Sequence, residues 1–403
     1  MQCLPTVSLT GAGWKVEGAP VHPGLGCREE RSWFIKNAVD NLQRYARKQP
    51  NPLAFTVLVL NAGSASLKAA LIGPSGERLW HGQRSWKPAS GADQADGLRP
   101  WLVEALGPRA DNLQLVVHRI VHGGERFTTP TRLDPSTIAA LEAITPLAPL
   151  HNGPALALVH AMGRWLNPAV QQWACFDTAF HHTLPLEART YALPASWRDQ
   201  GLRRFGFHGL NHQHIAEVVR VPRLISCHLG GGASLCAIRD GQSIATTMGY
   251  TPLEGLVMAT RSGSVDPGIL LHQLRQGLSA DQLEHALSQQ SGLLGLSNLS
   301  SDMGQLRAIA SGSEANNQEA AQLAIAVFRH QLIAGIGAMA ACLGGVDAIA
   351  LTGGIGQNDQ ALAGELRQAL GWLQPFELIQ IPADEEGLMA RQCQQAASPS
   401  HQE

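Results

Sequence analysis

Two glycine-rich segments of this chain repeat each other at a constant offset of 168 residues. Residues 61–71 read NAGSASLKAAL and residues 229–239 read LGGGASLCAIR. Each copy follows one apolar stretch and precedes another, which is the pattern of a strand–turn–strand hairpin. Coincidence among small residues is one interpretation. The other is a duplicated hairpin, one copy in each of two lobes, with nucleotide phosphates held between them.

The remainder of the chain alternates strand and helix patterns, which indicates an α/β architecture. Apolar runs predict strands at 56–61, 67–72, 115–121, 172–176, 348–351 and 377–381, and a strand–turn–strand unit at 224–238. Helical spacing and start signals predict one helix that begins at about 136. They predict further helices at 154–166, 267–276, 280–289, 316–343 and 359–370.

Bulk properties exclude several classes of protein. The chain has 403 residues, which favours two or three domains, and 30 basic against 32 acidic residues leave a net charge of −2. That balance gives no electrostatic footprint for nucleic acid or an anionic membrane. The apolar stretch Leu332–Val346 is too short to span a bilayer comfortably and predicts a buried helix.

The cysteines and the N-terminus indicate a cytoplasmic protein. The seven cysteines are scattered, odd in number and without a CxxC pair, which suits reduced thiols better than a disulfide framework or a zinc site. The N-terminus lacks a basic segment followed by an apolar run, so no secretory signal is visible there.

Three glycine-rich turns follow apolar strands, at Asn61–Ser64, Gly230–Gly232 and Gly353–Gly356. Glycine lets the backbone approach a ligand and direct N–H groups at phosphate oxygens. None is a Walker A loop, because no Gly-Lys-Ser/Thr follows, and the turn at Gly353 lacks the βαβ partner of a dinucleotide fingerprint. Together they favour a nucleotide cleft.

Nine segments, in order, resemble the acetate kinase (acetokinase) family of the acetate and sugar kinase, Hsp70 and actin superfamily. They are VLVLNAGSASLK (57–68), HRIVHGGE (118–125), PLAPLHN (146–152), FDTAFHHTLP (176–185), RRFGFHG (203–209), ISCHLGGGAS (225–234), MGYTPLEGLVMATRSG (248–263), LTGGIGQN (351–358) and IPADEEGLMAR (381–391).

The resemblance implies an α/β fold with two actin-like (ribonuclease H-like) lobes and ATP bound in the cleft between them. Residues 1–54 would be an N-terminal extension of unknown role. Residues 55–178 would form lobe I with the carboxylate-binding segment, completed by 385–403, and 179–384 would form the nucleotide-binding and catalytic lobe II. The implied activity is reversible, Mg²⁺-dependent transfer of the γ-phosphoryl group of ATP to acetate.

Arg119 matches the arginine with which the family holds the carboxylate substrate. A guanidinium pairs with a carboxylate through two parallel hydrogen bonds, which lysine cannot reproduce. The alternative is a structural arginine. By resemblance, the pocket for the acetate methyl group is formed by Val121, Leu150, Phe207 and Pro252.

Three further residues match the family's catalytic positions. His208 and Arg261 correspond to residues that stabilise the transferring phosphoryl group. Asp177 corresponds to a catalytic aspartate, but acetate is already ionised at neutral pH, so no proton has to be removed. We therefore expect Asp177 to orient an arginine or a magnesium-bound water; the alternative is an N-cap or turn aspartate.

Phosphoryl transfer implies Mg²⁺, with Mn²⁺ as a possible substitute, and ATP or ADP as cosubstrate. The family's metal-site residues map to Asn61 and Glu385, with a one-residue ambiguity toward Glu386. The resemblance assigns the nucleotide to Lys68, His228, Leu229, Gly230, Gly231, Gly232, Asp302, Met303, Gly304, Gly353, Gly354, Ile355, Gly356 and Gln357. Gly304 and Gln357 depart from the family pattern, which commonly has arginine and an acidic residue there.

The resemblance also implies a homodimer, and we expect no nucleic-acid or membrane partner. Two alternatives remain at this point. One is a propionate kinase of the same fold, and the other is a non-catalytic nucleotide-binding module of the superfamily. Such a module has no need for Arg119 and Asp177.

Overall fold

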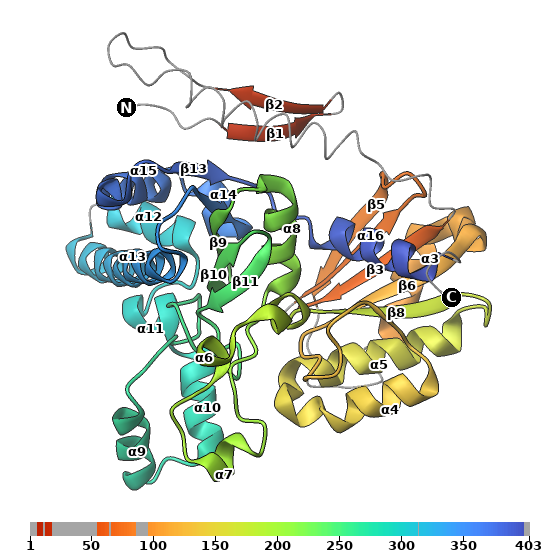
Figure 1. Cartoon of the computed structure of the whole chain (residues 1–403), viewed down its shortest axis with the longest axis horizontal. Coiled ribbons are helices and arrows are strands. Elements are labelled where there is room, and N and C mark those ends of the chain that lie inside the picture. Colours follow the sequence, from red (N-terminus) through yellow and green to blue (C-terminus); the bar gives the residue numbers. More distant parts are fainter. Residues whose placement is uncertain are drawn as a thin grey trace. The chain divides into compact units, whose positions relative to one another are not determined.

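The computed structural model describes residues 6–10, 13–17, 55–63, 66–85, 96–312 and 314–398, without the side chains of 6–10, 13–17, Asp111 and Leu150. It divides into two compact units (Figure 1). Of the described residues, unit 1 comprises 6–10, 13–17, 183–206, 215–312 and 314–383, and unit 2 comprises 55–63, 66–85, 96–182, 207–214 and 384–398. Most of the predicted extension 1–54 lies outside the described residues. Within it, β1 (Thr6–Thr10) and β2 (Gly13–Glu17) form an antiparallel hairpin.

Unit 2 is built on a six-stranded sheet with the order β5-β4-β3-β6-β8-β7. Strands β3, β4 and β5 form an antiparallel meander, and β6 and β8 continue the sheet parallel to β3. The strands are β3 (Thr56–Ala62), β4 (Ser66–Ile72), β5 (Arg78–Ser85), β6 (Leu113–Ile120), β7 (Thr131–Arg132) and β8 (Gln171–Phe176).

Helices cover both faces of this sheet (Figure 1). Even-numbered residues of β3 and β6, such as Leu58 and Val116, pack with α3 and α5. Odd-numbered residues such as Val59 and Val117 pack with α16, as expected when successive side chains of a strand point to opposite faces. The helices and 3₁₀ turns of unit 2 are α3 (Arg99–Leu106), η2 (Gly107–Asn112), α4 (Pro135–Ala143), η3 (Thr145–Leu147), α5 (Pro149–Trp165), η4 (Ala179–Thr183, of which Thr183 belongs to unit 1) and α16 (Glu385–Ala397).

Unit 1 repeats this topology in a five-stranded sheet with the order β11-β10-β9-β12-β13. Strands β9, β10 and β11 form an antiparallel meander, and β12 and β13 extend it parallel to β9. The strands are β9 (Arg223–Leu229), β10 (Ala233–Arg239), β11 (Gln242–Thr246), β12 (Ala348–Thr352) and β13 (Glu377–Gln380). The repeated sequence therefore occupies the same hairpin, β3–β4 and β9–β10, of two sheets with matching strand order.

The longest helix of unit 1, α13 (Ala315–Leu343), packs against β9, β10 and β11 and against helices α11 and α12. It is long and apolar enough to cross a membrane by length and composition, a test that core helices of soluble proteins also pass. Its buried residues include Leu332, Ile336 and Leu343, as predicted for the apolar stretch that begins at Leu332.

The other helices of unit 1 are α6 (Leu186–Arg189), α7 (Ala195–Arg198), α9 (Pro267–Arg275), α10 (Ala280–Gln289), α11 (Gly292–Ser297), α12 (Met303–Ala310), α14 (Gly353–Asn358), α15 (Gln360–Ala369) and η5 (Gly371–Leu373). Helix α8 (Gly209–Val219) begins in unit 2, and its residues from Ile215 belong to unit 1.

Two local predictions need correction. The glycine-rich segment at Gly353 is the first turn of α14 rather than an open turn, because Gly353 reverses the chain with φ of 80° and helical geometry follows. Helix α5 begins at Pro149 and runs through Pro154, where the prediction had it begin. Proline fits the first turn of a helix, and each of these two residues offers that signal.

Candidate functional site

Polar side chains replace apolar ones at the carboxyl ends of three parallel strands in unit 2. On the face toward α16, β3 changes from Val59 to Asn61 and β6 changes from Val117 to Arg119. Asp177 follows the last residue of β8. Ligands of α/β sheets bind at the carboxyl ends of the strands, so this edge is the natural place for a site.

Arg119 is the centre of this cluster. Its Nε donates to Asp177 Oδ1 at 2.9 Å, and its Nη2 donates to the other carboxylate oxygen. Its Nη1 donates to Asn61 Oδ1 at 3.0 Å. These bonds use three of the five N–H groups of a guanidinium, so two remain for a ligand.

Burial and nearby charges shift the pKa values of Arg119 and Asp177 in opposite directions. Burial alone would lower the pKa of Arg119, but the negative charges of Asp177 and Glu385 outweigh it and raise that pKa above its ordinary value. Burial raises the pKa of the Asp177 carboxyl, and Arg119 and the backbone N–H of His208 oppose that effect. Because three N–H donors point at this carboxyl group, we assign it as ionised.

The first turn of α16 brings two more carboxylates to the same place. Asp384 caps this helix by accepting from the N–H of Gly387 at 3.2 Å. Asn61 Nδ2 donates to Glu385 at 2.9 Å and to Glu386 at 2.7 Å. The structure therefore brings both glutamates to Asn61 and does not favour one over the other.

These residues fit a hard divalent cation. Three carboxylates and one guanidinium give the cluster a formal charge of about −2, and Mg²⁺ prefers oxygen ligands from one or two carboxylates together with water and phosphate. Among the described residues no group of three or more His, Cys, Asp or Glu side chains forms a complete metal cage. An open site of this kind suits a metal that arrives with a phosphate substrate.

His208 lies in a turn that is anchored to Asp177. Its backbone has φ of 57°, a left-handed conformation that is uncommon outside glycine, and its side chain is buried. The next residue, Gly209, donates its N–H to the carbonyl oxygen of Asp177 at 2.8 Å. His181 Nε2 lies 3.0 Å from the carbonyl oxygen of Phe207, and burial lowers the pKa of His181 to about 4, so this ring is neutral and donates. Backbone strain of this kind is typical of functional sites.

Gly209→Ala should disrupt this turn. A Cβ at position 209 would lie 2.2 Å from the carbonyl oxygen of Asp177, so the turn that carries His208 has to move. If His208 is catalytic, as the resemblance implies, kcat should fall by about 10²-fold, because small displacements of a catalytic group have effects of that order. Gly97→Ala is the matched control, since a Cβ there meets nothing within 4 Å. Steady-state kinetics with thermal melting of both variants is the measurement, and an unchanged kcat in Gly209→Ala would contradict this account.

The predicted methyl pocket is described only in part. Val121 is buried two residues beyond Arg119, and Phe207 is buried with its ring in a T-shaped arrangement with that of His122, at a centroid distance of 5.6 Å. The side chain of Leu150 lies outside the described residues. Pro252 belongs to unit 1, where its carbonyl oxygen accepts from Arg261 Nη1 at 2.8 Å.

A cavity of about 830 Å³ lies within unit 1. Four segments distant in the sequence form its wall: the turn after β9, the loop at Ala259, the start of α12, and α14 together with the start of α15. The lining residues are Gly230, Gly231, Ala259, Ser301, Asp302, Met303, Gly304, Arg307, Gly354, Ile355, Asn358, Asp359, Gln360 and Ala361. The size suits a nucleotide-sized ligand.

Half of this lining coincides with residues assigned to the nucleotide from the sequence: Gly230, Gly231, Asp302, Met303, Gly304, Gly354 and Ile355. His228, Leu229, Gly232, Gly353, Gly356 and Gln357 belong to the same unit but do not line the cavity, and Lys68 belongs to unit 2. A Cβ at Gly231 or Gly354 would meet nothing within 4 Å, so both backbones are open to a ligand. The other lining residues were not assigned to the nucleotide from the sequence: Ala259, Ser301, Arg307 and Asn358–Ala361. The signal for the last segment was the Asp359 cap of α15.

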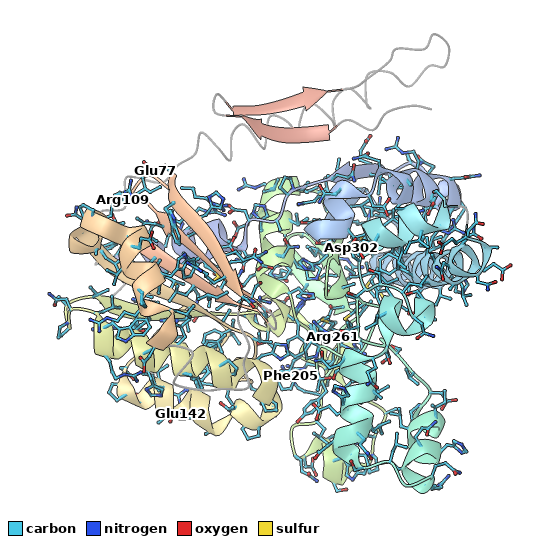
Figure 2. The ribbon with its side chains drawn as sticks, turned by 180° about the vertical axis from the view of Figure 1, so that it is seen from behind. Glu77, Arg109, Glu142, Phe205, Arg261 and Asp302 are labelled. Carbon is cyan, nitrogen blue, oxygen red and sulfur yellow. The ribbon has the colours of Figure 1, made fainter. Side chains whose placement is uncertain are left out.

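Arg261 belongs to unit 1, as does Asp302 (Figure 2). Its loop is fixed to the glycine turn of the cavity, because the N–H of Ala259 donates to the carbonyl oxygen of Gly231 at 3.2 Å. The first residues of α11 hold the loop from the other side: the N–H groups of Leu293 and Leu294 donate to the carbonyl oxygens of Met258 and Ala259.

A family model described as the acetokinase family matches residues 79–401. The chain belongs to the acetokinase family. The acetate kinase of Synechococcus sp. (strain JA-2-3B'a(2-13)) is 44% identical over 359 residues, which is 79% of this chain and 88% of that protein. The acetate kinase of Gloeobacter violaceus is 41% identical over 360 residues, with the same coverage of 79% and 88%.

Solved structures of the family share the fold. The Porphyromonas gingivalis acetate kinase has a TM-score of 0.74 at 30% identity. The aligned region covers 84% of this chain and 98% of that protein. A propionate kinase from Francisella tularensis has a TM-score of 0.75 at 29% identity, with the same coverage of 84% and 98%.

These findings confirm the predicted family, the two-lobed α/β fold and the assignment as a kinase, an enzyme that transfers phosphoryl groups. The roles of individual site residues stay predictions.

Proposed function

We propose that the chain catalyses reversible transfer of the γ-phosphoryl group of ATP to acetate, giving acetyl phosphate and ADP. The observation that carries the proposal is the guanidinium of Arg119, fixed by Asp177 and Asn61 with two N–H groups left to bind a small carboxylate. Its place at the carboxyl ends of the strands, within an acetokinase fold, supports this assignment.

The proposed reaction is an in-line displacement. A carboxylate oxygen of acetate attacks the γ-phosphorus, and the bond from that phosphorus to the β–γ bridging oxygen breaks, which leaves its electron pair on ADP. No proton has to be transferred, since acetate arrives ionised. Asp177 therefore acts by holding Arg119 rather than as a base.

His208 and Arg261 are the two side chains that we assign to the charge on the transferring phosphoryl group. Asn61, Glu385 and Glu386 are the residues that would hold Mg²⁺. When bound, the metal supplies positive charge to the β and γ oxygens of the nucleotide. The cavity of unit 1 is the proposed nucleoside site.

Trapping of acetyl phosphate tests this function. The full chain incubated with Mg²⁺, ATP and acetate should form acetyl phosphate, detected as its hydroxamate, with one ADP released for each. Parallel reactions with propionate compare the two acids. ATP hydrolysis without an acyl phosphate would overturn the proposal, and a higher kcat/KM with propionate would replace acetate by propionate as the substrate.

Val121→Ala tests the acyl pocket. If Val121 crowds the methyl group of the substrate, removal of two methyl groups should raise the ratio of kcat/KM for propionate to that for acetate by roughly tenfold, since a methylene is worth about 1–3 kcal/mol. Val117→Ala is the control, because Val117 lies in β6, just before Val121, in the core against α16. An equal ratio in all three proteins would remove Val121 from the pocket.

Four further properties belong to this proposal: Mg²⁺ as the physiological metal and a homodimer, which rest on the resemblance; a cytoplasmic location, which rests on the scattered cysteines and the N-terminal sequence; and the absence of nucleic-acid or membrane partners, which rests on the near-neutral charge. Metal dependence of the assay and the mass of the purified protein in solution test the first two.

A further inference from the structure

The cavity of unit 1 has a single basic side chain in its wall. Of its fourteen lining residues, all within the described part of unit 1, only Arg307 is basic, whereas Asp302 and Asp359 are acidic. Arg307 lies on α12 one turn after Gly304, so the two residues share a face of that helix.

The carboxylates of Asp359 and Glu365 hold the guanidinium of Arg307 through hydrogen bonds to its N–H groups. Its Nε donates to Asp359 Oδ2 at 3.1 Å, and its Nη1 and Nη2 donate to the two oxygens of Glu365 at 2.8 and 3.3 Å. Such bonds lie close to the guanidinium plane. Arg329 reinforces the arrangement, with its Nη1 3.5 Å from Glu365. Three of its five N–H groups are taken up by these carboxylates, so Arg307 offers a ligand the flat face of its guanidinium and two N–H groups.

The surroundings favour a neutral, flat ligand group over a phosphate. The charges of Arg307 and Arg329 are balanced by Asp359 and Glu365, and Asp302 adds a further negative charge to the wall. Gly304 contributes no side chain, and a Cβ there would approach only Asp302 Oδ1, at 3.2 Å. The space beside Arg307 on this face of α12 is therefore open.

We propose that Arg307 is the base-stacking residue of the nucleotide site, its guanidinium face lying against the nucleobase and favouring purines over pyrimidines. Planar guanidinium groups stack on aromatic faces, and a larger ring system gives more contact. This inference rests on the proposed function insofar as the cavity binds the nucleoside. It adds a residue that determines which nucleotide is used.

Arg307→Lys tests the inference, because lysine keeps the charge but has no flat face. Dissociation constants of the full chain are measured by calorimetry for ADP, GDP, CDP and pyrophosphate. We expect ADP and GDP to bind about tenfold more weakly to the variant, CDP to change less, and pyrophosphate to bind as before. Arg329→Lys is the matched control: it pairs with the same Glu365 but does not line the cavity, so all four constants should stay unchanged.

Three results would overturn the inference: equal weakening of pyrophosphate and ADP, which would make Arg307 a phosphate ligand; unchanged binding of ADP; or the same loss in Arg329→Lys. Thermal melting reports whether the variant is folded. If Arg307→Lys does not fold, Glu365→Gln loosens the clamp while Arg307 stays, and it should weaken ADP but not pyrophosphate. These measurements are independent of acetyl phosphate formation, so failure of the proposed function is recognised separately.

Discussion

Asp177→Asn is expected to lower kcat/KM for acetate by about 10²–10³-fold, with the loss mainly in the KM for acetate. The carboxylate accepts two hydrogen bonds from Arg119, whereas an amide offers one acceptor and turns an N–H toward the guanidinium. Removal of one partner of a buried, hydrogen-bonded charge pair costs about 2–5 kcal/mol. The measurement is steady-state kinetics with acetate varied at saturating ATP.

The distribution of this loss separates two roles of Asp177. If Asp177 were a proton acceptor, its loss would lower kcat and leave the KM for acetate unchanged. If Asp177 holds Arg119, its loss raises the KM for acetate. Asp134→Asn is the control, since Asp134 caps α4 through the N–H of Thr137 and asparagine caps equally well. A fall in kcat alone would contradict the orienting role.

Arg119→Lys is expected to raise the KM for acetate by about 10²-fold and to leave the dissociation constant of ADP unchanged. Lysine keeps the positive charge beside Asp177, but it cannot bind Asp177, Asn61 and a substrate carboxylate at once. The loss of a charged, bidentate hydrogen-bond pair is worth about 2–3 kcal/mol. The measurements are initial rates with varied acetate and calorimetric titration with ADP.

The control for Arg119→Lys is Arg164→Lys in the same unit. Arg164 pairs with Asp96 at 2.8 Å, but about half of each side chain is exposed, so the pair contributes little. If Arg119→Lys weakens ADP and acetate alike, or changes neither, Arg119 is not the carboxylate anchor.

Most strands could be read from the sequence because apolar runs and glycine turns are local signals, but β5, β7, β11 and the order of the strands in each sheet were not predicted. The copies at 61–71 and 229–239 predicted matching hairpins, and the two sheets contain them.

Contacts between distant segments could not be read in this way. The partner of Arg119, Asp177, is 58 residues away, and the sequence predicted only that this aspartate orients an arginine or a magnesium-bound water. The ambiguity between Glu385 and Glu386 persists because the first turn of α16 brings both to Asn61. Arg307 was missed because its significance depends on Asp359 and Glu365, which lie more than fifty residues later.

Acetate labelled with ¹⁸O on both oxygens tests the central claim most directly, by ³¹P NMR of the full chain with Mg²⁺ and ATP. If an acetate oxygen attacks the γ-phosphorus, acetyl phosphate should form with one ¹⁸O bonded to phosphorus, seen as an isotope shift of its signal. ADP should accumulate in equal amount without a shift. Formation of AMP and pyrophosphate, or of acetyl phosphate without the isotope shift, would contradict transfer of the phosphoryl group to acetate.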